Sequence, residues 1–416
     1  MNEIQQSQNL QDIRVLELTT TIAGPFCGRL LGDFGADVIK IEPARGDDIR
    51  FYGKRKDDVS LYASSLLRNK RLISLDPRRP EGQSLIYALI KQADVFIENF
   101  RPGTMEKWNL TYDILHKHNP SLVMVRISGF GQTGPYRHRP GYGIISEAMS
   151  GLRHITGEPD RPPSRLNTSL TDYITGLYAA FATMMALRHR DQTGEGQVID
   201  AALSEAAFSF MEPHVPAYDQ LKHNATRTGS ALENAAPNNL YVTQDNQYIL
   251  IAAPADAGFR RLMAAMGNPK LAQDPRFIDM ESRWRNVKAL DAIISAWTGQ
   301  RKLAELEAVL DEAAVPASPV YTMADIFRDP HFAEREMLLV QQHAKLGRIT
   351  LPGIVPKMSK TPGRVRWPGR DTGQDTRSVL HELLELSADQ LNRLESDGVI
   401  YSCEQTKKAG GNDGME

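Results

Sequence analysis

Short apolar runs alternate with helix-like stretches near the start of the chain. The runs are five to seven residues long and rich in Val, Ile and Leu, which is typical of buried strands. They lie at 13–18, 36–42, 72–76, 94–99 and 122–127, with helices predicted between them at 26–34 and 80–92. Strands that alternate with helices indicate a parallel sheet with helices on both faces. We therefore expect an α/β fold with a large Rossmann-like domain.

The segment 169–206 predicts a long helix followed by a strand. Asp172 stands at the helix start, and Gly194 ends the helix after three cationic residues at 188–190. Large and small residues separate at helical spacing; the large set is Ile174, Leu177, Tyr178, Phe181 and Met185, and the small set is Gly176, Ala179, Ala180, Ala182 and Ala186. We expect this helix to be mostly buried and closely packed, and residues 196–203 to form a strand.

The pattern changes twice more along the chain. Glycines and prolines interrupt 126–143, RISGFGQTGPYRHRPGYG, so this segment is predicted to be a loop, and long loops are often functional. After residue 229 the chain predicts a hairpin at 241–252 that turns at Asp245 and Asn246, a helix at 256–266, and helical patterns at 286–314 and 378–394.

These changes divide the chain into a large domain and a smaller α+β domain. We assign residues 1–229 to the first part of the large domain, 230–329 to the small domain, and 330–403 to a return to the large domain. Residues 404–416 carry no periodic apolar pattern and are expected to be a disordered tail. A length of 416 residues exceeds one ordinary core, which agrees with two domains.

Composition disfavours several kinds of partner. Lys and Arg total 49 against 51 for Asp and Glu, so the overall charge favours neither nucleic acid nor an anionic membrane. Cys27 and Cys403 lie near opposite ends without metal-ligand spacing, and no metal site is predicted. A polar N-terminus and the lack of an apolar run of about 20 residues predict a soluble, cytoplasmic protein.

Candidate binding residues follow four of the predicted strands. Ligands of parallel sheets bind beyond the carboxyl ends of the strands, which here lead into 19–23, 75–78, 99–101 and 128–134. The first turn, TTTIAGP, lacks GxGxxG, which disfavours a nicotinamide or flavin enzyme. Basic residues near these ends suit a phosphorylated ligand, although each alone also fits a solvated surface charge; they are Arg78, Arg79, Arg101, Lys107, Arg137 and Arg139.

Asp172 is the candidate for covalent chemistry. The helix dipole and unpaired N–H groups favour the ionised form of a carboxylate at a helix start, which suits a nucleophile. The alternative is that Asp172, or Thr171 before it, only caps the helix, because Asp is among the preferred N-cap residues. The position at a helix start does not separate these two interpretations.

Five blocks in order resemble one enzyme family. They are VLELTTTIAGPFCGRLLGDFGADVIKIE, NKRLISLDPRRPEG, ADVFIENFRPG, ISGFGQTGPY and the Asp172 segment with TGEGQ. Over residues 12–401 the chain resembles the formyl-CoA transferase and carnitine CoA-transferase family, also called class III CoA-transferases of the CaiB/BaiF type.

The resemblance implies an interlocked, ring-like homodimer in which both chain ends build each large domain. It implies that Asp172 is the nucleophile, and that an acyl-CoA and a free carboxylic acid are substrates with no tightly bound cofactor and no metal. The family's CoA-contacting positions carry over onto Thr21, Ile22, Ala23, Leu75, Arg78, Asn99, Phe100, Lys107 and Arg139.

The implied reaction begins when ionised Asp172 attacks an acyl-CoA thioester, which gives a mixed anhydride and CoA thiolate. The thiolate leaves readily because a thiol has a pKa near ~8.5. CoA then attacks the aspartyl carbonyl, releases the donor acid and leaves an aspartyl-CoA thioester. The acceptor carboxylate attacks this thioester, and CoA is passed on to it. Each addition builds an oxyanion that backbone N–H groups of a glycine-rich loop are suited to stabilise.

Two departures from the family pattern bear on the substrate. Gly143 stands where many relatives carry an acidic residue after the tyrosine of PGY, here Tyr142, and Glu147 one helical turn on is the candidate replacement. The glycine run that covers the site of formyl-CoA transferase is missing, and its expected counterpart is SALENAAPN at 230–238. The resemblance therefore does not fix the substrate.

Two other functions remain as alternatives. The 2-methylacyl-CoA racemases share the scaffold and use a histidine at the position of Tyr142, with His138 and His154 near in sequence. A non-catalytic CoA-binding protein is the second, and the intact Asp172 segment speaks against it. For a transferase, GLRHITGEPDRPPSR resembles relatives that use succinyl-CoA and short dicarboxylic acids; candidates to meet a second carboxylate are Arg137, Arg153, His154 and Arg165.

Overall fold

The computed structural model describes residues 8–403, which fall into two compact units. The first unit comprises the chain up to Leu152, the segment Leu166–Pro213 and the segment from Glu334 onward. The second comprises Arg153–Arg165 and His214–Ala333. The domain boundaries drawn from the sequence stay a prediction, and the expected tail at 404–416 lies outside the described residues. Between residues 8 and 403, no helix is both long and apolar enough to cross a membrane.

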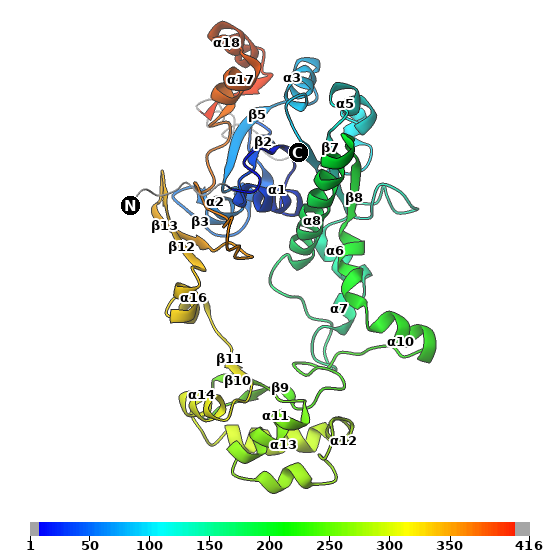
Figure 1. The fold of residues 1–416 in the computed structure, drawn as a ribbon, viewed down its shortest axis with the longest axis vertical. Coiled ribbons are helices and arrows are strands. Elements are labelled where there is room, and N and C mark those ends of the chain that lie inside the picture. The colour runs from blue at the N-terminus through cyan, green and yellow to red at the C-terminus, as the bar shows by residue number, and fades with distance from the viewer. Residues whose placement is uncertain (1–7, 404–416) are drawn as a thin grey trace. The chain divides into compact units, whose positions relative to one another are not determined.

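The first unit is built on a seven-stranded sheet in the order β14-β5-β2-β1-β6-β7-β8 (Figure 1). The strands are β1 Arg14–Leu18, β2 Asp37–Glu42, β5 Lys70–Leu75, β6 Val95–Glu98, β7 Val123–Ser128, β8 Val198–Ala202 and β14 Ile400–Tyr401. All neighbours pair in parallel except β14, which runs antiparallel to β5. The parallel strands follow the Rossmann order, so the predicted mostly parallel sheet is confirmed.

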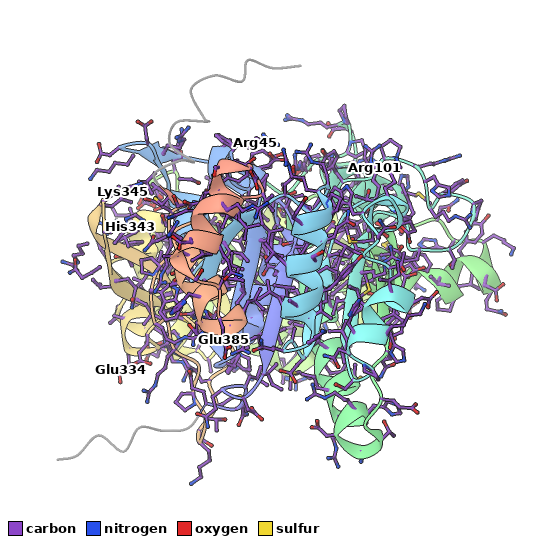
Figure 2. All side chains as sticks on the ribbon, turned by 90° about the horizontal axis from the view of Figure 1, so that it is seen from above. Arg45, Arg101, Glu334, His343, Lys345 and Glu385 are labelled. Atoms are coloured by element: carbon purple, nitrogen blue, oxygen red, sulfur yellow. The ribbon has the colours of Figure 1, made fainter. Side chains whose placement is uncertain are left out.

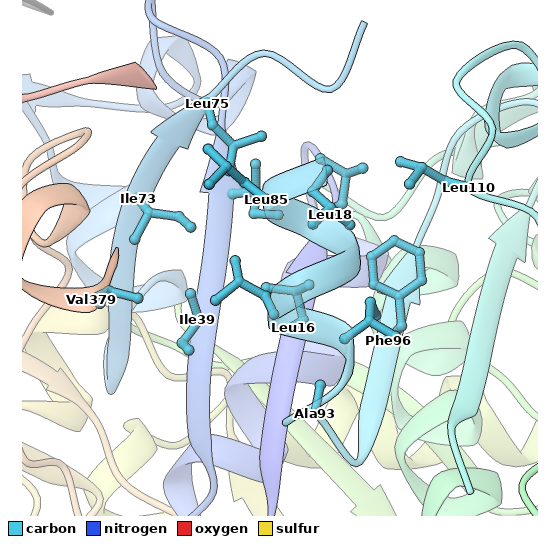
Figure 3. Packing of buried hydrophobic residues seen from close by; sticks show 14 of the residues in the cluster. Leu16, Leu18, Ile39, Ile73, Leu75, Leu85, Ala93, Phe96, Leu110 and Val379 are labelled. Carbon is cyan, nitrogen blue, oxygen red and sulfur yellow. The ribbon is translucent and has the colours of Figure 1, made fainter. Parts of the chain in front are cut away.

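Helices cover both faces of this sheet because successive strand residues point to opposite sides. One face packs against α3 Pro80–Ile90, α5 Tyr112–His118, α17 Thr376–Leu384 and α18 Ala388–Ser396. Figure 3 shows this core, a single cluster that includes Leu16 and Phe96 of the strands and Leu85 of α3. The other face packs against α1 Ala23–Asp33, α8 Leu170–Thr193 and α9 Leu203–Phe208.

Shorter elements complete the first unit. They are the hairpins β3 Arg55–Lys56 with β4 Val59–Ser60 and β12 Leu338–His343 with β13 Gly347–Pro352, and the helices α2 Leu61–Leu66, α4 Thr104–Lys107 and α6 Gly143–Met149. The helical pattern predicted at 378–394 forms two helices, α17 and α18, because the chain turns at Glu385 with φ of 55°. The predicted loop at 126–143 holds no helix or strand between Ser128 and Gly143.

The second unit is a three-stranded antiparallel sheet with helices on one face. The strands are β9 Asn238–Val242, β10 Tyr248–Ala252 and β11 Ala317–Pro319, and the first two form the predicted hairpin. Its core is closed by α11 Asp256–Ala265, α13 Val287–Thr298 and α14 Leu303–Glu312. Further helices of the chain are α7 Leu152–Ile155, α10 His214–Leu221, α12 Met280–Arg285, α15 Met323–Ile326 and α16 Pro330–Glu334.

α8 is buried on one side only, whereas the sequence predicted a mostly buried helix. Its small residues are buried against α1, and a β-carbon on Gly176 would stand 2.6 Å from the carbonyl oxygen of Ala23. Such a close approach of two helices leaves room only for small residues between them. The large residues predicted to be buried lie on the exposed side instead; Leu177, Tyr178, Phe181 and Met185 are 58%, 44%, 57% and 57% exposed. The expectation of close packing therefore holds for the small side of α8, and the expectation of burial does not hold for its large side.

Candidate active site

The turn after β1 is fixed by a residue from the neighbouring strand β6. Asn99, directly after β6, accepts a hydrogen bond from Thr20 N at 2.8 Å and donates one to Thr20 O at 2.8 Å. β1 and β6 lie side by side where the strand order reverses, and ligands of open α/β sheets bind at this point. The turn that holds the predicted contacts Thr21, Ile22 and Ala23 is therefore rigidly presented at the expected place.

Asp47 holds the same turn from the other side. Its Oδ1 accepts hydrogen bonds from Thr21 N at 2.9 Å and from Thr20 Oγ1 at 3.2 Å, and its Oδ2 pairs with Lys40 at 2.7 Å. Thr21 has a positive φ of 68°, a conformation that a β-branched residue rarely adopts without support. Asp47 supplies that support, and sequence reasoning missed it because it lies beyond β2 in a polar loop.

A buried network of charges underlies this turn. Lys40 contacts Glu17 at 3.2 Å and donates to Thr19 O at 2.7 Å, and Lys70 contacts Glu17 at 2.6 Å. Burial would raise the pKa of Glu17, but Lys70 and Lys40 hold it below its ordinary value. Burial lowers the pKa of Lys70 to about 8 against the attraction of Glu17. Glu17 and Lys40 stand inside apolar runs of the sequence, and a charge in such a run indicates a buried charged partner.

A second buried pair lies at the ends of β6 and β7. Glu98 accepts from Arg126 Nε at 2.7 Å and from Phe100 N at 2.9 Å, so it fixes the backbone at a predicted CoA contact. Burial raises the pKa of Glu98 to about 7, although the hydrogen bond from Arg126 opposes that rise. The ring of Phe100 meets Trp108 edge-on, with centroids 5.0 Å apart.

The other predicted contacts differ in exposure. Leu75, the last residue of β5, is buried, whereas Arg78 is exposed and bonded to Asp76 at 2.8 Å. Lys107 is exposed at the end of α4, and the guanidinium of Arg139 lies over the Tyr136 ring at 3.7 Å from its centroid. Arg45 and Arg101, which follow β2 and β6, lie along one edge of the unit, and Glu385 lies at the opposite edge (Figure 2).

Asp172 lies in the first turn of α8 but is not its N-cap. The N-cap is Ser169, and the helix begins at Leu170, so the interpretation of Asp172 or Thr171 as the capping residue was wrong. Asp172 is half-buried, and its carboxylate lies against the backbone of Gly143, the first residue of α6. The side chain is therefore held at the end of the long loop that precedes α6.

Tyr62 and Tyr173 lie near this carboxylate. Tyr62 and Tyr173 share a hydrogen bond of 2.6 Å between their hydroxyl groups, and Tyr173 meets Phe26 edge-on. Burial raises the pKa of Tyr62, and the bond to Tyr173 and the negative charge of Asp172 raise it further. Tyr142, next to Gly143, is 63% exposed. The site thus combines a carboxylate with tyrosine hydroxyl groups.

The remaining candidates do not all join this group. Glu147 is half-buried in α6, one turn after Gly143, whereas Arg137 and His138 are exposed in the preceding loop. Arg153, His154, Arg165 and the segment 230–238 belong to the second unit, so their roles stay predictions. Among residues 8–403, no group of three His, Cys, Asp or Glu side chains is arranged to hold a metal ion.

Comparisons with known proteins agree with this architecture. The family model for CoA-transferase family III matches residues 10–376. The chain is 45% identical over 393 residues to the succinyl-CoA--D-citramalate CoA-transferase of Chloroflexus aurantiacus, covering 94% of this chain and 98% of that one. It is 42% identical to the succinyl-CoA--L-malate CoA-transferase beta subunit of the same organism, with the same coverage. A crystal structure of a CAIB/BAIF family protein from Brucella suis is 35% identical, with a TM-score of 0.82 over 91% of this chain and 100% of that one.

Proposed function

The chain belongs to CoA-transferase family III, and on that premise we propose that it transfers CoA from succinyl-CoA to a short dicarboxylic acid through covalent intermediates on Asp172. The observation that carries this proposal is the position of the Asp172 carboxylate. It is half-buried, lies against the backbone of Gly143 and belongs to the same unit as the strand ends that carry the predicted CoA contacts. A carboxylate held in this way is suited to attack an acyl carbon.

The proposed steps move one CoA from succinate to the acceptor acid without net loss of the thioester. An Asp172 oxygen bonds to the succinyl carbonyl carbon while the C–S bond breaks, which releases CoA thiolate and leaves a mixed anhydride. The thiolate attacks the aspartyl carbonyl and expels succinate, which leaves an aspartyl-CoA thioester. The acceptor carboxylate then attacks this thioester, whose C–S bond breaks to release CoA thiolate and leave a second anhydride. The thiolate attacks the acceptor acyl carbon of that anhydride and displaces Asp172 as a free carboxylate.

We assign the binding of CoA to the turn at Thr21, Ile22 and Ala23 and to the neighbouring strand ends. Backbone groups of a rigid turn bind a polar chain without a large ordering cost, and the bonds from Asn99 and Asp47 supply that rigidity. Arg78, Lys107 and Arg139 are exposed cations suited to the phosphates of CoA. Leu75 and Phe100 complete the assigned contacts as apolar surface. Tyr142 and Glu147 are the candidate assisting residues.

We also propose that two chains form an interlocked homodimer. The exposed apolar side of α8 supports this, because Leu177, Phe181 and Met185 are each more than half exposed. Apolar surface of this kind on a soluble protein marks an interaction site. The positions of Cys27 and Cys403 near opposite ends of the chain fit a reducing cytoplasm.

The acceptor acid is tested by a substrate screen. Purified protein with succinyl-CoA is offered D-citramalate, L-malate, acetate and butyrate, and new CoA thioesters are separated by chromatography. We expect thioesters of the dicarboxylic acids and release of one succinate per thioester formed. Transfer to acetate or butyrate alone would contradict the dicarboxylate assignment, and conversion of an acyl-CoA without any second acid would favour the racemase alternative.

A further inference from the structure

Gly143 has no side chain, and the Asp172 carboxylate occupies the space where a side chain would begin. A β-carbon built on Gly143 would stand 3.0 Å from Cγ of Asp172 and closer still to its Oδ2, whereas ordinary contacts to such an atom are 3.4–4 Å. No other side chain is among the three nearest atoms of that position. The carboxylate therefore fills the volume of the missing side chain.

The backbone gives no other reason for glycine at this position. The φ of Gly143 lies outside the left-handed region that favours glycine, and the residue begins a helix. Glycine is a poorer helix former than alanine by about 1 kcal/mol. Conformation and helix propensity would therefore both tolerate or favour alanine here, and the nearest obstacle to its β-carbon is the carboxylate of Asp172.

We propose that Gly143 is a positioning residue, whose lack of a side chain sets where the Asp172 carboxylate rests. This inference rests on the proposed nucleophilic role of Asp172. The obstacle that a new β-carbon would meet is the end of a flexible side chain, not backbone. The fold absorbs the substitution, and the carboxylate moves away by about 1 Å, a displacement that in an active site can cost about a hundredfold in rate.

The test is Gly143→Ala in the full chain, assayed with succinyl-CoA and the best acceptor from the screen. We expect kcat to fall by about tenfold to a hundredfold, with KM for succinyl-CoA changed less than about threefold and Tm unchanged or raised. The rate of covalent adduct formation at Asp172, measured by quenching and mass spectrometry, should fall by the same factor as kcat.

Two matched variants distinguish an effect on the position of the Asp172 carboxylate from a general loss of packing. Gly258→Ala, in α11, places its β-carbon 3.6 Å from the nearest atom and should leave both kcat and Tm near wild type. Gly176→Ala meets the backbone of Ala23 at 2.6 Å and should lower Tm. Wild-type kcat in Gly143→Ala would overturn the inference, as would a fall in kcat accompanied by a lower Tm like that of Gly176→Ala. The proposed function fails separately, if Asp172→Asn keeps full activity.

Discussion

The side chain of Asn99 makes two hydrogen bonds to the backbone of Thr20, each of 2.8 Å, and so ties the turn after β1 to the end of β6. The pair spans the point where the strand order of the sheet reverses. The oxygen and nitrogen of the Asn99 amide bond to the N–H and C=O groups of Thr20, so the turn has little freedom relative to β6. The predicted CoA contacts at Thr21, Ile22 and Ala23 depend on this tie.

Asn99→Ala should weaken the binding of CoA thioesters. Loss of two hydrogen bonds worth about 1 kcal/mol each loosens the turn, and we expect KM for succinyl-CoA to rise by about tenfold with a smaller change in kcat. Steady-state kinetics measure this. Asn392→Ala is the control, because Asn392 in α18 accepts an exposed hydrogen bond from Arg377 in α17. An unchanged KM in Asn99→Ala would mean that the turn does not bind CoA.

Asp47→Ala should destabilise the first unit. It leaves the buried Lys40 without its 2.7 Å partner and removes the oxygen that accepts hydrogen bonds from Thr20 and Thr21. The free energy of unfolding should therefore fall by about 3 kcal/mol. Denaturant titration measures the change. Asp48→Ala breaks only the exposed pair with Arg45, so its effect should stay below about 1 kcal/mol. Equal effects of the two substitutions would contradict the supporting role of Asp47.

Glu98 should give stability a pH dependence below neutrality. Burial raises the pKa of this carboxyl from 4.5 to about 7, so between these values the folded protein binds more protons there than the unfolded chain does. The contribution of Glu98 to stability therefore falls as pH rises from 4.5 to 7. Glu98→Gln lacks this titration, and the free energy of unfolding of wild type minus that of the variant should be smaller at pH 7.5 than at pH 5. A pH-independent difference would show that Glu98 is ionised throughout.

Charge on the exposed side of α8 should separate the proposed dimer. Leu177→Asp and Phe181→Asp place carboxylates on surface that we expect a second chain to cover, so the sedimenting species should change from dimer to monomer. Met185→Leu keeps the surface apolar and should leave the assembly intact. A wild-type protein that sediments as a monomer at micromolar concentration would rule out the dimer.

Much of the sheet could be predicted from the sequence. The strands β1, β2, β5, β6 and β7 are apolar runs bounded by polar turns, and their parallel pairing follows from the alternation with helices. The orientation of α8 could not be predicted in the same way. Periodicity separates a large face from a small face, but close packing on α1 at Gly176 buries the small one.

The strand ends of the candidate site were predicted from the sequence. The residues that hold these ends in place were not. Thr21 and Asn99 follow strands that could be recognised, so the structure brings their backbones together as the parallel sheet requires. Asp47 acts through contacts with residues more than twenty positions away, which no local pattern encodes. The contact between Gly143 and Asp172 was missed for the same reason.

Covalent capture at Asp172 tests the central claim most directly. Wild-type protein and Asp172→Asn are mixed with succinyl-CoA, quenched within one turnover and digested, and the peptides are weighed. The nucleophile role predicts a succinyl or CoA adduct on the peptide that contains Asp172 in wild type. In the variant, it predicts no adduct and a loss of transfer of at least about a thousandfold. An adduct on another residue, or full transfer by Asp172→Asn, would contradict it.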